Sequence, residues 1–563
     1  MKKILILSLV AGTVVLSACS KFGPLSADNV TVTPTPLEAA GGEVNATISA
    51  TFPQKYMKKK VTLEVTPVLK YEGGEVASES TTFQGEKVQG NATTVGYAVG
   101  GNYTMRASFP YTSAMQKSDL YLRLDPRQGS KHYKVDDVKV GYGVIATGEL
   151  AQATVQTANA ATAPDAYQRI IREKQEAQIK YLVNQANVRA SELNTNSIKD
   201  FVKILKEISA NQAMQLKNIE VSAYASPEGR YDFNEKLAEK RQDSSSEYVN
   251  KQLKDNKLRT DVDTRYTAED WEGFQQLVSE SNIQDKEVIL RVLSMYKDPA
   301  EREQQIRNMS VIYDELAEAV LPELRRARLI ANYEVIGRSD TEIVQQFQQD
   351  ASKLGIEEIL YGASLQRTPE QKKVWYERAT QLFPNDARAY NNLASLAMNA
   401  GNEATAQSYL QKARSIDPNN AAAATNQALI ALAKGHVEEA EAALAKGGSA
   451  DTYNEVLGNL NLAKGNYAAA AANLADSYTN SAALAHILNK DYAAAAATLA
   501  GIDTPDAYTA YLSAILSARQ NDADGVVNHL QDAIRQDATL AKRAATDLEF
   551  VQFATQIAQV LGQ

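Results

Sequence analysis

Cysteine and histidine are scarce in this sequence of 563 residues, which contains one cysteine and four histidines. A single cysteine excludes an intramolecular disulfide and every zinc site that needs two thiolates. None of the histidines lies at metal-ligand spacing from another or from the cysteine; they are His132, His436, His486 and His529. The sequence therefore predicts no metal and no cofactor.

Recurrent catalytic motifs are also missing. The sequence has no Gly-x-Ser-x-Gly elbow, no phosphate-binding loop and no dinucleotide fingerprint. Paired carboxylates such as Asp136 and Asp137 are most simply solvated, although sequence alone does not reveal the two opposed carboxylates of a glycosidase. We expect a binding and scaffolding protein and not an enzyme.

Long apolar runs are confined to the start of the chain. Lys2 and Lys3 precede an apolar run that ends in Leu-Ser-Ala just before Cys19. The run is shorter than the ~20 apolar residues that span a bilayer, so we predict a removable signal peptide over residues 1–18 and a tether over 19–28. This segment resembles a bacterial lipobox, which implies that Cys19 is acylated and becomes the mature N-terminus. A periplasmic chain of this kind depends on packing and not on disulfides.

Charge supports attachment through lipid. Removal of the leader takes away Lys2 and Lys3, so the formal net charge moves from −9 to −11. A mildly acidic protein has no general attraction to nucleic acid or to anionic lipid headgroups. We therefore expect membrane attachment through several acyl chains on Cys19, because one chain alone holds a protein only marginally. An acidic cluster just after the cysteine resembles the surface-export signal of such lipoproteins, and residues 20–23 have no such cluster. We therefore predict an outer-membrane anchor with the domains facing the periplasm.

The region from 29 to 156 alternates between apolar and polar residues. Residues 44–48 and 61–65 have the period of two that is typical of half-buried strands, and glycine pairs separate such segments. We predict an immunoglobulin-like β-sandwich that acts as a spacer or docking module. An Ala- and Thr-rich stretch over 157–164 predicts a linker.

Alanine dominates from about 345 to 563, where the pattern repeats with a period of about 34 residues. Pro384 and Pro418 are separated by one such period, and each closes a predicted helix. The same small and large residues recur in successive units: Gly401, Ala406 and Leu410, then Gly435, Ala440 and Leu444. This spacing resembles the tetratricopeptide repeat, with an ordinary alanine-rich bundle as the alternative. The resemblance implies a superhelix whose concave face binds a protein or peptide.

A strand followed by a turn and a helix lies in the middle of the chain. Residues 219–223 alternate as a buried strand, Ser226-Pro227-Glu228-Gly229 ends it, and 231–253 predicts a helix. Asn234 and Arg241 share one face of that helix. This stretch resembles the OmpA-like peptidoglycan-binding domain, which we place over 165–338 with an insertion over about 254–322 and a closing strand near 324–329.

The family resemblance implies a site for diaminopimelate in the wall peptide. An aspartate there faces the ammonium and an arginine faces the carboxylate, for which bidentate arginine is suited. Arg241 and Asn234 match the family, but Ser226 stands at the aspartate position, and a hydroxyl supplies no negative charge. Two interpretations stay open. In the first the domain binds the wall peptide, with Glu228 facing the ammonium or with the peptide held differently. In the second the domain binds a replacement ligand and Arg241 pairs with a neighbouring carboxylate.

The insertion resembles that of long OmpA-like lipoproteins from anaerobic Gram-negative bacteria, many of which also carry tetratricopeptide repeats. The expected fold is a multidomain α+β chain with a β-sandwich, a central αβ domain and a C-terminal helical superhelix. We expect an envelope scaffold that binds peptidoglycan or a replacement ligand and recruits a protein partner through its repeats. The alternative is an accessory factor of an outer-membrane assembly or secretion complex without wall binding.

Overall fold

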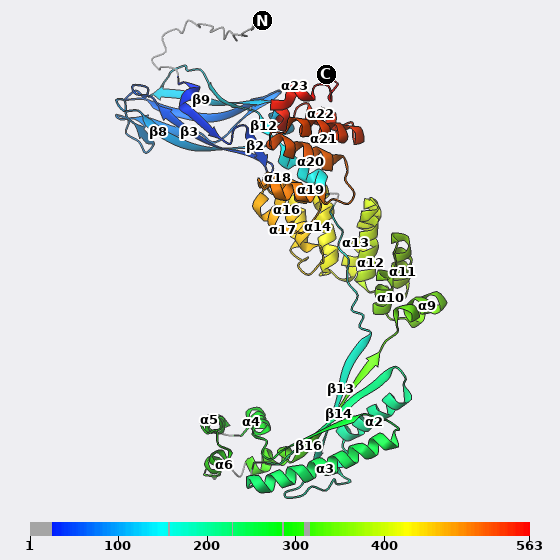
Figure 1. Cartoon of the computed structure of the whole chain (residues 1–563). Coiled ribbons are helices and arrows are strands. Elements are labelled where there is room, and N and C mark those ends of the chain that lie inside the picture. The colour runs from blue at the N-terminus through cyan, green and yellow to red at the C-terminus, as the bar shows by residue number, and fades with distance from the viewer. Residues whose placement is uncertain (1–24, 156–157, 228, 284–285, 309–315, 563) are drawn as a thin grey trace, which may run out of the picture. The chain divides into compact units, whose positions relative to one another are not determined.

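The computed structural model describes residues 25–155, 158–227, 229–283, 286–308 and 316–562 (Figure 1). The chain divides into two compact units. Unit 1 contains Met1–Pro164 and Gln366–Gln563, and unit 2 is Asp165–Leu365. Cys19 and Glu228 lie outside the described residues. Among the residues described, no helix has both the length and the apolar character needed to cross a membrane.

Two sheets form the N-terminal part of unit 1, here called the β region. The first sheet contains β1 (Val30–Thr33), β2 (Leu37–Ala40), β3 (Glu43–Phe52), β8 (Gly101–Pro110) and β12 (Val144–Ile145). The second contains β4 (Thr62–Tyr71), β5 (Gly74–Ala77), β6 (Thr81–Gly85), β7 (Thr93–Val95), β9 (Ser118–Gln128), β10 (Lys131–His132) and β11 (Val138–Tyr142). Neighbouring strands are antiparallel, except that β12 runs parallel to β2 and β7 parallel to β6.

Alternation of side chains along the strands creates the core of the β region. In β3 every second residue is buried, including Val44 and Ile48. They pack with Leu63 of β4 and Leu122 of β9 from the other sheet. Because successive side chains in a strand point to opposite faces, the sequence period of two places one apolar face of each sheet in a shared interior. The predicted β-rich N-terminal region is confirmed.

The C-terminal part of unit 1 is an array of helix pairs (Figure 1). The helices are α11 (Pro369–Leu382), α12 (Ala387–Asn399), α13 (Glu403–Ile416), α14 (Ala421–Ala433), α15 (Val437–Leu444), α16 (Tyr453–Ala463), α17 (Tyr467–Asn473), α18 (Asn480–Leu488), α19 (Tyr492–Ala500), α20 (Ala507–Arg519) and α21 (Ala523–Gln536). The array ends in α22 (Leu540–Ala544), η7 (Leu548–Phe553) and α23 (Ala554–Ile557).

Recurring small residues explain the pairing of these helices. Gly401 and Gly435 end the first helix of two successive pairs with φ of +70° and +77°, which glycine adopts without steric cost. Ala406 and Ala440 are fully buried at the contact between the helices of a pair. A larger side chain at these positions would separate the helices, so the period of the sequence is also the period of the packing.

Unit 2 is built on a four-stranded sheet covered on one face by two helices. Its elements are β13 (Ile170–Lys180), α2 (Asn196–Ala210), β14 (Met214–Tyr224), α3 (Tyr231–Asp255), β15 (Asp261–Thr267), α4 (Trp271–Glu280), α5 (Lys286–Met295), α6 (Pro299–Arg307), α8 (Leu321–Leu324), β16 (Arg326–Ile336), α9 (Asp340–Asp350) and α10 (Ile356–Ser364). The strand order is β13-β16-β14-β15, and only β14 and β15 are parallel.

Two apolar clusters stabilise unit 2. Phe201 of α2 and Val249 of α3 pack on Val221 and Leu329 of the sheet. A separate cluster, which includes Phe274, joins the helices of the insertion. Strand β15 belongs to the four-stranded sheet, whereas the sequence assigned its residues to an insertion over about 254–322. Helices α9 and α10 group with unit 2, whereas the sequence placed the start of the repeats near 345.

Candidate functional site

The residues that the sequence selected in unit 2 converge at the carboxyl end of β14. The Nδ2 atom of Asn234 donates to the carbonyl oxygens of Ser226 and Gly229, both at 3.0 Å. Ser226 and Asn234 are buried, with 4% and 3% of their surface exposed. The amide of Asn234 therefore holds both ends of the short turn between β14 and α3.

Arg241 is 1% exposed and lies beside the same strand end. Its guanidinium donates to the carbonyl oxygens of Tyr224 at 2.8 Å, Gln185 at 3.0 Å and Leu182 at 3.2 Å. The guanidinium carbon also lies 5.1 Å from the ring centroid of Tyr181. These contacts tie α3 to β14 and to the loop after β13. Binding of a ligand carboxylate at Arg241 stays a prediction.

An acidic residue that the sequence gave no role lies next to this turn. The backbone N–H of Asp270 donates to the carbonyl oxygen of Ala225 at 3.3 Å. Its carboxylate accepts from the Gly273 N–H at 2.9 Å and from Arg326 at 3.0 Å, and both side chains of the ion pair are largely buried. Burial raises the pKa of Asp270. Its position just before α4 was the one available sequence signal, and it indicates only a helix cap.

A second candidate site is the inner face of the helix array, defined as the face lined by α12, α14 and α16. The segment of residues 158–163 lies on it, and we call this segment the strap. Asn426 of α14 pairs with both backbone groups of Ala161: the Ala161 N–H donates to Oδ1 at 2.6 Å, and Nδ2 donates to the Ala161 carbonyl at 2.8 Å. Asn392 of α12 pairs in the same way with Ala163, at 2.7 and 3.0 Å. Each asparagine thus binds the strap as a neighbouring β-strand would.

The spacing of these contacts follows the repeat. Asn392 and Asn426 are one repeat period apart and bind alternate residues of the strap. Asn391 connects the two asparagines, because it donates to Asn392 Oδ1 at 3.1 Å and accepts from Asn426 Nδ2 at 3.0 Å. All three asparagines are fully or almost fully buried, and we call them the asparagine row.

Other strap contacts also involve backbone groups. The Asn159 N–H donates to Glu455 at 3.0 Å, and Ser395 donates to the Ala160 carbonyl at 3.3 Å. Thr162 donates from its hydroxyl to Asp451 at 2.8 Å. Ala161 is fully buried, so its small side chain allows the close approach of the two main chains. The stretch that the sequence predicts as a linker is therefore bound along the helix array.

Comparisons with known proteins concern the C-terminal helices. Residues 375–408 match the tetratricopeptide repeat family model. The C-terminal helices are tetratricopeptide repeats. A tetratricopeptide repeat protein from Parabacteroides merdae is 14% identical over 42% of this chain and 93% of that one, with a TM-score of 0.26. The Pseudomonas aeruginosa pilF structure is 19% identical over 38% and 95%, with a TM-score of 0.26. PilW, a type IV pilus biogenesis factor, is 15% identical over 35% and 90%, with a TM-score of 0.24. No curated protein matches the chain.

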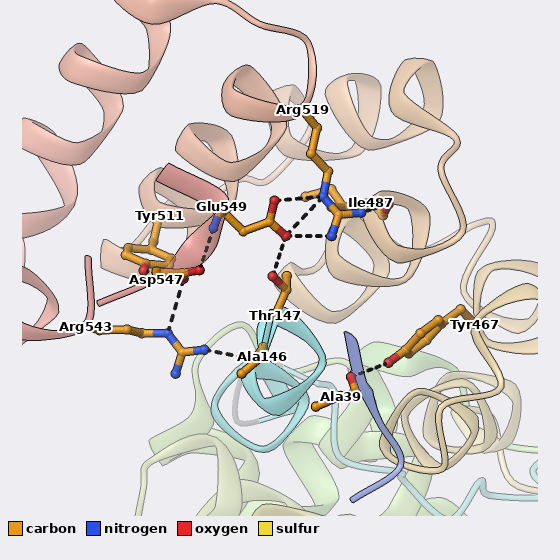
Figure 2. Close-up of polar contacts among 10 residues, drawn as sticks. All are labelled: Ala39, Ala146, Thr147, Tyr467, Ile487, Tyr511, Arg519, Arg543, Asp547 and Glu549. Atoms are coloured by element: carbon orange, nitrogen blue, oxygen red, sulfur yellow. Dashed lines mark hydrogen bonds and ion pairs between the residues drawn. The ribbon is translucent and has the colours of Figure 1, made fainter. Parts of the chain in front are cut away.

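Where the tetratricopeptide repeats meet the β region, a buried polar network joins them (Figure 2). Arg519 forms a 2.6 Å ion pair with Glu549 and donates to the Ile487 carbonyl at 3.0 Å. Glu549 also accepts from the hydroxyl of Thr147, which follows β12, at 2.5 Å. Only 12% of the Arg519 side chain and 5% of the Glu549 side chain are exposed. Their pairing therefore compensates for the loss of water around both charges.

Beside this pair lies a second buried group in the same network. The Tyr511 hydroxyl donates to Asp547 at 2.8 Å, and Arg543 donates to the Ala146 carbonyl at 3.2 Å. Burial raises the pKa of Asp547 and that of Tyr511. Further along the junction, the Tyr467 hydroxyl donates to the Ala39 carbonyl of β2 at 3.4 Å. The network thus fixes the chain at Thr147, well before the strap ends at Ala163.

The inner face is covered between these two fixed points as well. Residues Thr147–Leu150 form a short 3-10 helix, η3, and Ala151–Thr154 form α1. Leu150 and Ala151 join the apolar cluster of the last repeats, and Val155 joins the cluster around α14. Residues 147–155 and 158–163 thus pack along the repeats of the same chain. Within the described part of the chain, no three His, Cys, Asp or Glu side chains come together as metal ligands do.

Proposed function

We propose that this protein is a scaffold of the Gram-negative cell envelope, anchored in the outer membrane through an acylated Cys19 and not itself an enzyme. The repeats carry the protein interactions, and unit 2 binds peptidoglycan or a replacement ligand. The observation that supports the scaffold most directly is the row of tetratricopeptide repeats, whose inner face already binds an extended segment by its backbone. Such repeats imply protein partners on the helical region.

The strap restricts where an external partner binds. Since the asparagine row is occupied by Ala161 and Ala163, a partner has to use another surface of the repeats or displace the strap. Exposed apolar residues on the repeats include Tyr478 and Val374, which are 62% and 55% exposed. A photo-crosslinking residue at Tyr478 or Val374 should give one defined crosslinked protein in intact cells. Crosslinking to one defined protein from a buried position such as Asn426 alone, with none from Tyr478 or Val374, would contradict partner binding at these outer positions.

Wall binding by unit 2 is the second part of the proposal. An OmpA-like domain is supported by the strand β14, the turn at Ser226, and the helix α3 with Asn234 and Arg241 at the strand end. Strand β16, with Arg325 just before it and Arg326 as its first residue, corresponds to the predicted closing strand. The immunoglobulin-like sandwich, as a finer description of the β region, is supported by its two sheets around one core.

A peptidoglycan pulldown with the full chain tests this part. Retention of the native protein at low and moderate salt supports wall binding. No retention contradicts it and leaves the runner-up, an accessory factor of an outer-membrane assembly or secretion complex. One observation favours the runner-up: the guanidinium of Arg241, the residue expected to bind the ligand carboxylate, is buried against three backbone carbonyls.

The anchor and its orientation have separate tests. A Cys19→Ser variant should lose incorporation of labelled palmitate and appear in the soluble fraction, whereas the native chain stays with the membranes. Protease added to intact cells should leave the native protein uncut if its domains face the periplasm. Cleavage from outside would place the domains on the cell surface.

A further inference from the structure

One end of the β region carries a cluster of lysines. Two loops meet there, residues 53–60 between β3 and β4, and residues 86–100 that surround β7; together we call them the lysine tip. The strand register places both loops at the same end, because Thr62 pairs with Gln84, Gly85 with Val95 and Phe52 with Gly101. The charged residues of the tip are Lys55, Lys58, Lys59, Lys60, Lys87 and Glu86. A strongly positive end therefore occurs in an acidic chain.

The loops of the lysine tip are held firmly against one another. The Lys55 N–H donates to the Tyr97 carbonyl at 2.6 Å, and the Lys87 N–H donates to the Lys59 carbonyl at 2.7 Å. A methyl group at Gly85 would lie 2.1 Å from the Lys58 carbonyl oxygen, so the two main chains are in close contact. Loops that are already ordered lose little entropy when they bind, which favours them as a docking surface.

An exposed apolar residue lies at the outer edge of the tip. Val99 is 78% exposed, in the turn closed by the bridge between Gly96 and Gly100. The Nζ atoms of Lys58 and Lys59 each lie 5.7 Å from the centroid of the nearby Tyr97 ring. Lysines around an exposed apolar and an aromatic residue are the combination that an anionic membrane surface binds.

The first described residues of the chain lie at the same end of the β region as this tip. Val30 of β1 pairs with Ala50 of β3, just before that strand ends at the tip. Leu25, the first described residue, follows Cys19 closely in the chain, at a separation of at most about 20 Å for an extended segment. The other end of the β region meets the repeats (Figure 1). There Gly41 packs on the backbone of Lys464. The tip is thus the end of the β region turned away from the repeats.

We propose that the lysine tip binds the anionic phospholipid headgroups of the membrane in which Cys19 is anchored, with Val99 entering the headgroup layer. The location in the cell rests on the proposed acyl anchor, but the binding itself does not. Net charge alone predicts no attraction to anionic headgroups, whereas this proposal is based on the local charge of the tip. An acyl chain together with a basic patch anchors a protein more firmly than one acyl chain does.

Vesicle flotation of a chain that begins at Ser20 and ends at Gln563 tests the proposal, since this chain keeps every described residue and lacks Cys19. The native sequence should bind vesicles of mixed phosphatidylglycerol and phosphatidylcholine at low ionic strength. Because salt screens charges, the native chain should dissociate from these vesicles at high ionic strength. It should not bind vesicles of phosphatidylcholine alone. The triple variant Lys58→Ala, Lys59→Ala, Lys60→Ala should bind roughly 100-fold more weakly. Val99→Asp should weaken binding independently, by roughly tenfold.

A control with the same change of net charge is Lys199→Ala, Lys203→Ala, Lys206→Ala on α2, where all three lysines are exposed. This variant should bind as the native chain does, and all variants should keep the native unfolding temperature. Equal binding of the tip variant and the control would overturn the proposal, as would absence of native binding at low salt. Labelling of the full chain with palmitate tests acylation of Cys19 separately. Failure of the proposed anchor is therefore distinguishable from failure of lipid binding by the lysine tip.

Discussion

Replacement of one asparagine in the asparagine row should weaken the binding of the strap. Asn426→Ala removes three hydrogen bonds, two with Ala161 and one with Asn391. The N–H of Ala161 is then left in a fully buried position without its acceptor. The Ala161 carbonyl keeps a donor, because Asn391 Nδ2 also donates to it at 3.2 Å. With about 1 kcal/mol for the lost bonds that are not replaced and about 1–3 kcal/mol for the unsatisfied N–H, we expect local destabilisation of about 2–4 kcal/mol.

Hydrogen exchange measures this loss at the residue concerned. The Ala161 amide opens locally, so its exchange in Asn426→Ala should be faster than in the native chain by roughly 30-fold or more, at about 1.4 kcal/mol for each factor of ten. The register of the strap adds a second criterion. Asn392→Ala should speed exchange at Ala163 more than at Ala161, because Asn392 binds Ala163.

Asn399 of α12 provides a matched control, since it is an exposed asparagine on the same helix as Asn392. Asn399→Ala should leave the exchange of both strap amides unchanged. If Ala161 exchanged at the same rate in the native chain and in Asn426→Ala, the strap would not be held by the asparagine row, and the reasoning from backbone pairing would be wrong.

Three further changes test the other polar groups. Glu549→Gln leaves the buried Arg519 without its counter-charge, so the free energy of unfolding of unit 1, measured in urea, should fall by about 3 kcal/mol. The control Glu438→Gln, on the exposed face of α15, should leave it unchanged. Burial raises the pKa of Asp547 above 3.8, so between 3.8 and the folded pKa the folded chain holds a proton that the unfolded chain releases. Native stability therefore falls as pH rises through this range, and the stability gained by Asp547→Asn should grow. A difference in stability that does not change with pH would contradict the raised pKa. If the site holds the ammonium of diaminopimelate, Ser226→Asp should raise the affinity for a diaminopimelate-containing wall peptide roughly ten- to a hundredfold in calorimetry. The control Ser279→Asp should leave this affinity unchanged. Calorimetric traces without a binding signal for the native chain and for Ser226→Asp would contradict wall binding.

The parts of the fold with a strong local period were predictable from the sequence. Strand β3 was recognisable because its burial alternates at every residue. The repeats were recognisable because Ala406 and Ala440 occupy the same buried helix contact one period apart. In both cases the feature that stabilises the element is also the feature that repeats in the sequence.

Other features had no local signal. Strand β15 (Asp261–Thr267) was not predicted from the sequence. Its sequence is mostly polar, because an edge strand that buries few side chains needs no apolar alternation. The ion pair joins residues 30 apart, Arg519 at the end of α20 and Glu549 in η7, so neither residue is distinctive on its own. At the candidate ligand site the sequence placed Asn234 and Arg241 on one helix face, and both lie at the end of β14. The burial of Arg241 depends on contacts with three backbone carbonyls that no motif encodes.

The docking of the strap was the largest omission, and its physical reason affects function. The strap is rich in alanine and its sequence has no periodicity. The asparagine row binds the backbone of the strap, so other small side chains would also fit. The strap is also part of the same chain as the groove, and a short tether gives it an effective concentration on the order of millimolar. A free peptide of equal intrinsic affinity would occupy the asparagine row only above that concentration. A protein partner that binds another surface of the repeats avoids this competition, while the strap and its asparagine row stabilise the connection to the β region.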